Sequence, residues 1–206
     1  PIPAIPTAAS PTPICVGGTD PTLTASGAGG AVFNWYSDAS LTTNVQTGAS
    51  YTPTVSGVAG TYQYYVTQTV LGCQSAARVV TVVVNPAVVA AAGSDATLCS
   101  GSSVALGGSP TGSGGNGSYT YSWSPTVGLS NSTASNPILT RTVASPTTFT
   151  YTVTVTDGNL CVGTDQVDIT FNPIPVLTPQ ADIVECSDFA QPAITFVTNI
   201  DPVTSY

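Results

Sequence analysis

One pattern of cysteine and aromatic residues occurs twice in the chain and begins a third time. Cys15, Cys99 and Cys186 lie 84 and 87 residues apart, and each is followed by a short polar turn and an alternating segment. An aromatic-x-Trp sequence then follows the first two cysteines, FNW at residues 33–35 and YSW at residues 121–123. A repeat this regular predicts a chain of similar units, each with a core of its own.

The two complete copies of the pattern also end in the same way. A second cysteine, Cys73 or Cys161, follows each tryptophan by 38 residues, and each copy closes on the dipeptide Asn-Pro. The proline-containing segments PIPA and PIPV, before the first copy and after the second, are typical of stiff connectors. We therefore expect three domains, the last of them incomplete, at residues 1–86, 87–173 and 174–206.

The longest threonine-rich segment, FTYTVTVT at residues 149–156, alternates strictly between apolar and polar positions. Such alternation places the aromatic residues and valines on one face of a strand and the threonines on the other. No segment shows a helical apolar stripe, and the turns are rich in glycine and proline. The chain is thus predicted to be all-β, with tandem antiparallel β-sandwiches, two complete and a third begun. The expected strands lie near residues 21–26, 32–36, 61–70, 77–84, 103–107, 119–123, 148–156 and 165–171.

Five cysteines and no histidine favour disulfides over a zinc site, and disulfides favour a location outside the cytoplasm. In each unit the first cysteine precedes a strand and the second lies in a hairpin, so we expect both at one end of the sandwich. The predicted pairs are Cys15–Cys73 and Cys99–Cys161. Closing loops of this length stabilises a domain by roughly 3–4 kcal/mol in the chain-entropy model.

Cys186 opens the pattern a third time and has no later cysteine to pair with. Tyr206 occupies the aromatic position of the third aromatic-x-Trp sequence. The residues therefore predict a window on a longer chain, in which a neighbouring copy or the next repeat covers this last segment.

The charged residues exclude several classes of function. The chain has two basic and ten acidic residues and a net charge of −8, so nucleic acid and anionic membranes are unfavourable partners. The absence of histidine excludes Ser-His and Cys-His catalysis, and no cofactor motif is present. Asp20, Asp38, Asp95 and Asp157 lie beside turn-forming residues, where we expect their side chains to cap the backbone. Asp157, Asp165 and Asp168 could instead converge on a calcium site at one end of the second domain, but their spacing does not match a calcium loop.

Aromatic residues are candidates for both core and surface roles. Trp35 and Trp123 each share a strand face with another aromatic residue, and we expect both to be core residues. Tyr36 and Tyr65 are out of phase with that face, so they are candidates for an outward contact surface that could bind surface glycans.

Taken together, these elements resemble a known group of repeats. The second unit contains LCSGSSVALGGSP, YTYSWSPTVGLS and FTYTVTVTDGNLC, and the first contains ICVGGTDPTLTASG, FNWYSD and TYQYYVTQTVLGC. These sequences are similar to polycystic-kidney-disease-like (PKD-like) and immunoglobulin-like (Ig-like) repeats of large secreted Bacteroidota proteins. The resemblance implies β-sandwiches in adhesins, gliding-associated proteins or extracellular fibres, with no shared catalytic residues. That family often has glycine before the second cysteine; Gly72 fits, whereas Leu160 departs from the pattern.

Two functions from different classes follow from these observations. The first is a structural segment of an extracellular repeat protein, without catalysis, that assembles with neighbouring copies into a filament, fibre or adhesin stalk. The alternative is a carbohydrate- or protein-binding accessory module of a larger secreted protein.

Overall fold

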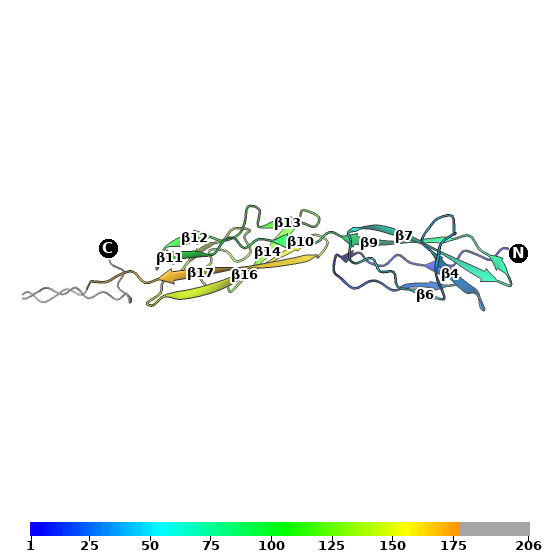
Figure 1. Cartoon of the computed structure of the whole chain (residues 1–206), viewed down its shortest axis with the longest axis horizontal. Helices are drawn as coiled ribbons and strands as arrows, with labels where there is room; N and C mark the ends of the chain where they lie inside the picture. Colours follow the sequence, from blue (N-terminus) through cyan, green and yellow to red (C-terminus); the bar gives the residue numbers. More distant parts are fainter. Residues whose placement is uncertain (178–206) are drawn as a thin grey trace, which may run out of the picture. The chain divides into compact units, whose positions relative to one another are not determined.

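The computed structural model describes residues 1–177, which form strands, turns and loops without a helix (Figure 1). The prediction of an all-β chain is therefore confirmed for the described part. None of the described segments is a helix with the length and apolar character that crossing a membrane requires. The expected third domain, including Cys186, lies outside the described residues except for its first few positions.

The first sandwich is built from two sheets, one with strand order β1-β3-β6 and one with order β2-β9-β7-β4-β5, where β8 also pairs with β7. Its strands are β1 (Thr7–Ala8), β2 (Ile14–Cys15), β3 (Leu23–Ser26), β4 (Val32–Tyr36), β5 (Asn44–Thr47), β6 (Ser50–Tyr51), β7 (Gly60–Val70), β8 (Cys73–Gln74) and β9 (Arg78–Asn85). These strands pair antiparallel except for β2 with β9, which are parallel.

The second sandwich has a four-stranded sheet of order β11-β17-β16-β14 and two strand pairs, β12–β15 and β10–β13. Its strands are β10 (Val88–Ala90), β11 (Ala96–Cys99), β12 (Ser103–Ala105), β13 (Gly112–Gly114), β14 (Tyr119–Ser124), β15 (Ile138–Thr140), β16 (Thr147–Asp157) and β17 (Val162–Asn172). Here too the short strand that carries the first cysteine, β11, runs parallel to the last strand, β17.

The chain folds into two compact units that do not follow the sequence in two blocks. Unit 1 comprises Pro1–Ala90, Gly112–Thr120 and Thr154–Thr164, and unit 2 comprises Ala91–Thr111, Tyr121–Val153 and, among the described residues, those from 165 to 177. The β10–β13 pair and the turn between β16 and β17, which carries Cys161, are thus part of unit 1, although they belong to the second half of the sequence. Residues from both halves of the repeat pattern build this unit.

Each sandwich holds its tryptophan at the centre of its core. Trp35 is fully buried beside Tyr51, with the ring centroids 6.1 Å apart, and its indole N–H donates a hydrogen bond to the Gly48 carbonyl. Trp123 is buried likewise, and its N–H donates to the Ala134 carbonyl at 3.0 Å. A buried indole that also satisfies its only donor packs without leaving an unpaired polar group.

All eight strands expected from alternation are present, with ends shifted by a few residues. The sequence pattern did not predict nine further strands of the described residues, which are only two to four residues long. A strand this short shows at most two periods of alternation, too few to predict it from the pattern, so its pairing depends on the neighbouring strand. Two of these short strands, β2 and β11, carry the cysteines discussed below.

Replacing the first core tryptophan tests this account of the core. Trp35→Ala should lower the free energy of unfolding by about 3–5 kcal/mol, because a large buried side chain is lost and a cavity remains. The control is Val32→Ala on the same strand, whose side chain is half exposed and should change stability by about 0.5 kcal/mol or less. Urea unfolding followed by circular dichroism measures both, and equal losses would contradict the assignment of Trp35 to the core.

Candidate functional site

Cys15 lies where the short strand β2 runs beside the end of β9. Its Cα partner is Asn85, and the next N–H, that of Val16, donates to the Asn85 carbonyl at 3.0 Å. The Gly18 N–H then donates back to the Cys15 carbonyl at 2.9 Å. Gly17 between them has φ +81°, a conformation that only glycine adopts without a steric penalty. The chain therefore turns sharply after Cys15 and holds it at the end of β9.

Cys161 ends the turn that joins β16 to β17. The N–H of Asp157, the last residue of β16, donates to the Cys161 carbonyl at 3.0 Å. Leu160, directly before the cysteine, has φ +64°, so it keeps the left-handed backbone for which related repeats use glycine. The departure at Leu160 thus changes the residue and not the backbone conformation. Cys161 itself is 2% exposed.

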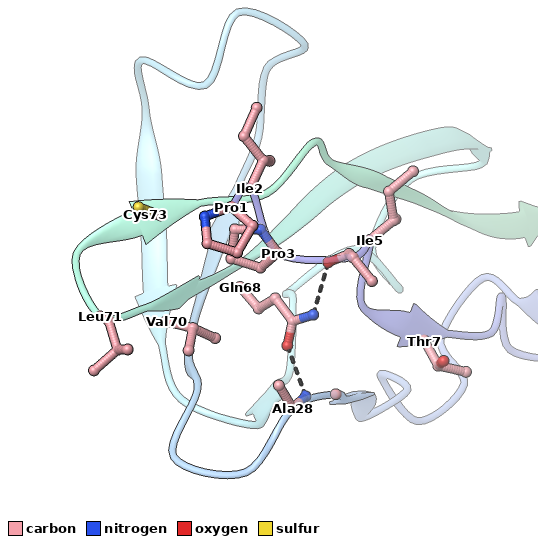
Figure 2. Close-up of a pocket in the computed structure, with 12 residues that line it drawn as sticks. Pro1, Ile2, Pro3, Ile5, Thr7, Ala28, Gln68, Val70, Leu71 and Cys73 are labelled. Carbon is pink, nitrogen blue, oxygen red and sulfur yellow. Dashed lines mark hydrogen bonds between the residues drawn. The ribbon is translucent and has the colours of Figure 1, made fainter.

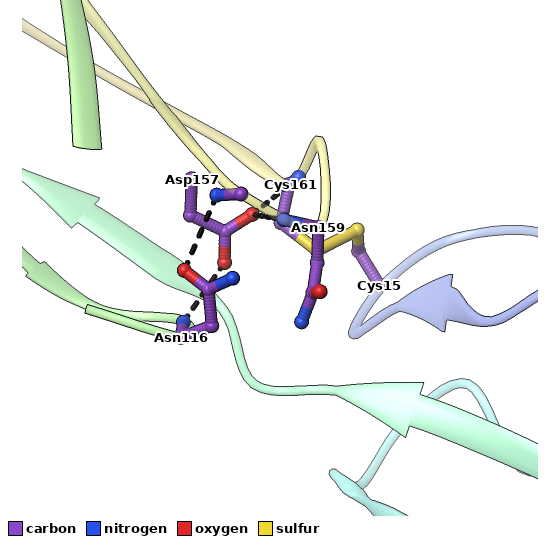
Figure 3. The surroundings of a disulfide bond; sticks show 6 residues. Cys15, Asn116, Asp157, Asn159 and Cys161 are labelled. Atoms are coloured by element: carbon purple, nitrogen blue, oxygen red, sulfur yellow. Dashed lines mark hydrogen bonds between the residues drawn. A yellow bond between two sulfur atoms is a disulfide. The ribbon is translucent and has the colours of Figure 1, made fainter. Parts of the chain in front are cut away.

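A buried carboxylate organises this turn, as Figure 3 shows. The Oδ1 atom of Asp157 accepts hydrogen bonds from the N–H groups of Asn159 and Cys161, both at 2.9 Å. Its Oδ2 atom accepts one from the N–H of Asn116 at 2.9 Å. The side chain of Asn116 in turn accepts a hydrogen bond from the Gly158 N–H. Asp157 therefore fixes the backbone that presents Cys161.

The charge of Asp157 is maintained by these donors. Burial raises the pKa of this carboxyl, but the N–H groups of Cys161, Asn116 and Asn159 together lower it by more, so the pKa lies below its ordinary value. The folded state thus favours the carboxylate, the form that accepts all three hydrogen bonds.

The two cysteines form a disulfide, Cys15–Cys161, with a Cα–Cα distance of 5.7 Å and a sequence separation of 146 (Figure 3). Both belong to unit 1. The bond joins the predicted first domain to the predicted second domain, and it closes a far longer loop than either expected pair. In the chain-entropy model such a loop stabilises the folded state by roughly 5 kcal/mol.

The predicted pair Cys15–Cys73 is wrong, because the whole of β7 separates the two residues. Cys73 is the partner of Val70 at the end of β7, whereas Gly60 at its start pairs with Val84, next to the residue that Cys15 faces. Ten residues of strand span ~33 Å. A disulfide allows a Cα–Cα distance of only about 4.4–6.8 Å.

The predicted pair Cys99–Cys161 is wrong for the same reason. Cys99 is the Cα partner of Asn172 at the end of β17, whereas Cys161 directly precedes Val162, where β17 begins. Cys73 and Cys99 both carry free, exposed thiols. In each repeat the two cysteines therefore lie at opposite ends of a long strand, and the expectation that they share one end of the sandwich was mistaken.

Tyr36 and Tyr65 lie opposite each other on the neighbouring strands β4 and β7. Both are half-buried; the Tyr36 hydroxyl accepts a hydrogen bond from the Gln74 amide, and the Tyr65 hydroxyl donates to the Gln63 side chain. Tyr65 is also the Cα partner of Val79 on β9. The structure thus brings the two tyrosines into one row, and their use as a contact surface stays a prediction.

The three aspartates that could form a calcium site each accept hydrogen bonds from a different part of the fold. Asp157 holds the turn before Cys161, Asp165 accepts a hydrogen bond from the Ala92 N–H at 2.7 Å, and Asp168 accepts one from the Thr150 hydroxyl. Within residues 1–177, no group of three or more Asp, Glu or Cys side chains is placed to hold a metal ion.

A cavity of about 560 Å³ opens beside Cys73 in unit 1, and sequence reasoning did not predict it (Figure 2). Gln68 lies at its base, where its amide donates to the Ala4 carbonyl at 2.7 Å and accepts from the Ala28 N–H at 2.9 Å. The rest of the lining is mainly apolar and includes Ile2, Pro3, Ile5, Val70 and Leu71.

The repeat pattern, the sandwiches and the disulfide define a class of protein, that of tandem all-β modules with a disulfide. Comparison with protein families agrees with this class. Residues 3–86 match the family described as Ig-like domain, CHU_C associated, and residues 92–171 match a PKD domain family. The chain therefore contains an Ig-like domain followed by a PKD-like domain. Domains of these kinds are typical of extracellular repeat modules and are generally non-catalytic.

Solved structures with a similar arrangement include a titin I-band fragment, at 10% identity and a TM-score of 0.44, covering 82% of this chain and 65% of that chain. They also include the two Ig domains of DIP-gamma, at 12% identity and a TM-score of 0.43, covering 80% of this chain and 94% of that chain. Likenesses at this level carry no argument about function. No curated protein sequence matches the chain.

The lowered pKa of Asp157 leads to a prediction about acid stability. A depressed folded-state pKa contributes stability that is present above the ordinary carboxyl pKa near 4 and is lost as the pH falls through the folded-state value. Asp157→Asn should therefore be less stable than the parent chain at pH 7 and should lose less stability than the parent between pH 5 and pH 2.

The matched control is Asn159→Ala, which removes an exposed side chain but keeps the backbone N–H that Asp157 accepts. Thermal unfolding of the oxidised chains across this pH range measures the effect. If Asp157→Asn and Asn159→Ala showed the same pH dependence, the role given to the carboxylate would be contradicted.

Proposed function

We propose that this chain is a load-bearing structural segment of an extracellular tandem-repeat protein, such as a fibre, filament or adhesin stalk. The observation that carries the proposal is the Cys15–Cys161 disulfide, which joins the Ig-like domain to the PKD-like domain. A bond of this kind forms and persists outside the cytoplasm, where the two module families are typically found.

The disulfide determines where tension passes through the chain. When the two termini are pulled apart, the covalent path runs from the N-terminal segment to Cys15, through the two sulfur atoms, and on from Cys161. Residues 16–160 lie outside this path. They include every strand from β3 to β16, so the strands that hold both tryptophans do not bear the load.

The sparse charge of the chain supports assembly with neighbouring copies. With 6% charged residues, the threonine- and serine-rich faces of two copies can meet with few charged side chains in the contact, and salt screens the repulsion that the net charge of −8 produces at longer range. Unpaired sheet edges offer further contact sites, because their N–H and C=O groups can pair with another chain. Neighbouring copies of the chain are accordingly the partners that we propose.

Single-molecule stretching tests the load path. In the oxidised chain, residues 16–160 should not extend at forces that unfold comparable domains. Reduction should release those residues, which corresponds to roughly 500 Å of additional contour length.

Cys15→Ser is the matched variant for this experiment, because it should show the released length without any reductant. If the oxidised parent chain released the same length as Cys15→Ser, the disulfide would not carry the load and the proposed function would lose its support.

A further inference from the structure

The environment of the free Cys99 repeats that of Cys15 residue by residue. Cys99 faces Asn172 as its Cα partner on the parallel last strand, and the next N–H, that of Ser100, donates to the Asn172 carbonyl at 2.7 Å. The Ser102 N–H donates back to the Cys99 carbonyl at 3.0 Å, and Gly101 between them has φ +84°. We call Cys15 and Cys99 the strand cysteines.

The free Cys73 corresponds in the same way to Cys161, and we call these two the hairpin cysteines. Each follows its tryptophan by 38 residues and comes directly after a residue with a left-handed backbone, Gly72 at φ +82° or Leu160 at φ +64°. Each is also the first residue to pair back with the preceding strand. The one disulfide of the described residues joins a strand cysteine to a hairpin cysteine of the following repeat.

The surface around Cys73 is apolar and uncovered within the described chain. Cys73 lies at the edge of the 560 Å³ cavity, and the turn residue Leu71 beside it is 99% exposed (Figure 2). Cys161, the hairpin cysteine that forms a disulfide with Cys15, is buried by contrast. An exposed apolar surface next to a free thiol is suited to a covering partner, and the bonded pair identifies that partner as a strand cysteine.

We propose that Cys73 and Cys99 are the two halves of a further disulfide of the Cys15–Cys161 kind, formed between successive repeats. Cys99 bonds the hairpin cysteine of the repeat that follows, and Cys73 bonds the strand cysteine of the repeat that precedes. The neighbouring repeat belongs either to a second copy of this chain or to a further stretch of the same polypeptide, and the chemistry is the same in both. The inference deepens the proposed function and rests on it, since the bonds would extend the covalent load path from repeat to repeat.

The bond forms by thiol–disulfide exchange with a small-molecule disulfide such as oxidised glutathione. The two cysteine thiols lose two protons and two electrons as their S–S bond forms. The S–S bond of the oxidant breaks and takes up the same two protons and two electrons, which yields two small-molecule thiols.

Variants that keep only one of the two thiols test the pairing, in a Cys186→Ser background that removes the cysteine outside the described residues. The parent chain, oxidised with glutathione, should form a ladder of covalent oligomers. Cys73→Ser alone and Cys99→Ser alone should each remain monomeric. Their equimolar mixture should yield dimers and nothing larger, at least tenfold more than either variant alone on a non-reducing gel. Since both thiols are exposed, replacing them with serine should leave the fold intact.

Two outcomes of this mixing experiment would overturn pairing between copies. Dimers formed by one variant alone, in amounts equal to those in the mixture, would show that like cysteines pair with like. A mixture that stays monomeric would show that copies of the chain do not supply the partner.

Disulfide mapping of the protein from its natural source distinguishes the two origins of the partner. A Cys99 peptide joined to the Cys73 peptide identifies a second copy, and one joined to a hairpin cysteine of different sequence identifies a further repeat. Cys99 recovered as a free thiol, together with a monomeric mixture above, would overturn the inference. Stretching the Cys73→Ser/Cys99→Ser double variant tests the proposed function separately, because that variant keeps only the bond between Cys15 and Cys161.

Discussion

The parallel pairing of β2 with the end of β9 is the contact on which the covalent organisation of the chain depends. Only two residues of β2 take part, yet they hold Cys15 at the end of the first sandwich where the chain leaves through Asn85. The turn at Gly17 and the carboxylate network of Asp157 then bring the two sulfur atoms within bonding distance. A shift of either turn would leave Cys15 and Cys161 as free thiols.

Placing two cysteines at opposite ends of one sandwich has a different consequence from placing them at one end. Paired within one sandwich, they would stabilise that sandwich alone. At opposite ends, the strand cysteine of the first repeat, Cys15, bonds the hairpin cysteine of the second, Cys161, so this bond stabilises segments of both repeats together. The long central strand, β7 in the first sandwich, sets this separation, because Cys15 lies near its start and Cys73 at its end. The proposed load path therefore depends on the same bond that stabilises the folded chain.

The sequence predicts those parts of this structure that depend on local pattern. The eleven-residue strands β7 and β16 alternate over several periods, and the spacing from tryptophan to cysteine identifies equivalent positions in the two repeats. The partner of each cysteine was not predictable in that way, because it depends on strands of two to four residues that are too short to be recognised from alternation. Asp157 was expected to cap a turn, but its contact with Asn116 joins segments 41 residues apart. The cavity beside Cys73 likewise depends on how the first residues of the chain lie against Gln68.

Disulfide mapping of the folded chain tests the Cys15–Cys161 bond most directly. Cleavage at the only two basic residues places Cys15 and Cys73 on one fragment, Cys99 on a second and Cys161 on a third. After the free thiols of the Cys186→Ser chain are blocked, trypsin cleaves at Arg78 and Arg141 and gives fragments 1–78, 79–141 and 142–206. The structure predicts that fragment 1–78 is joined to fragment 142–206, and that fragment 79–141 is released with a blocked Cys99. Fragment 1–78 released alone, with fragment 79–141 joined to fragment 142–206, would contradict the structure and restore pairing within each repeat.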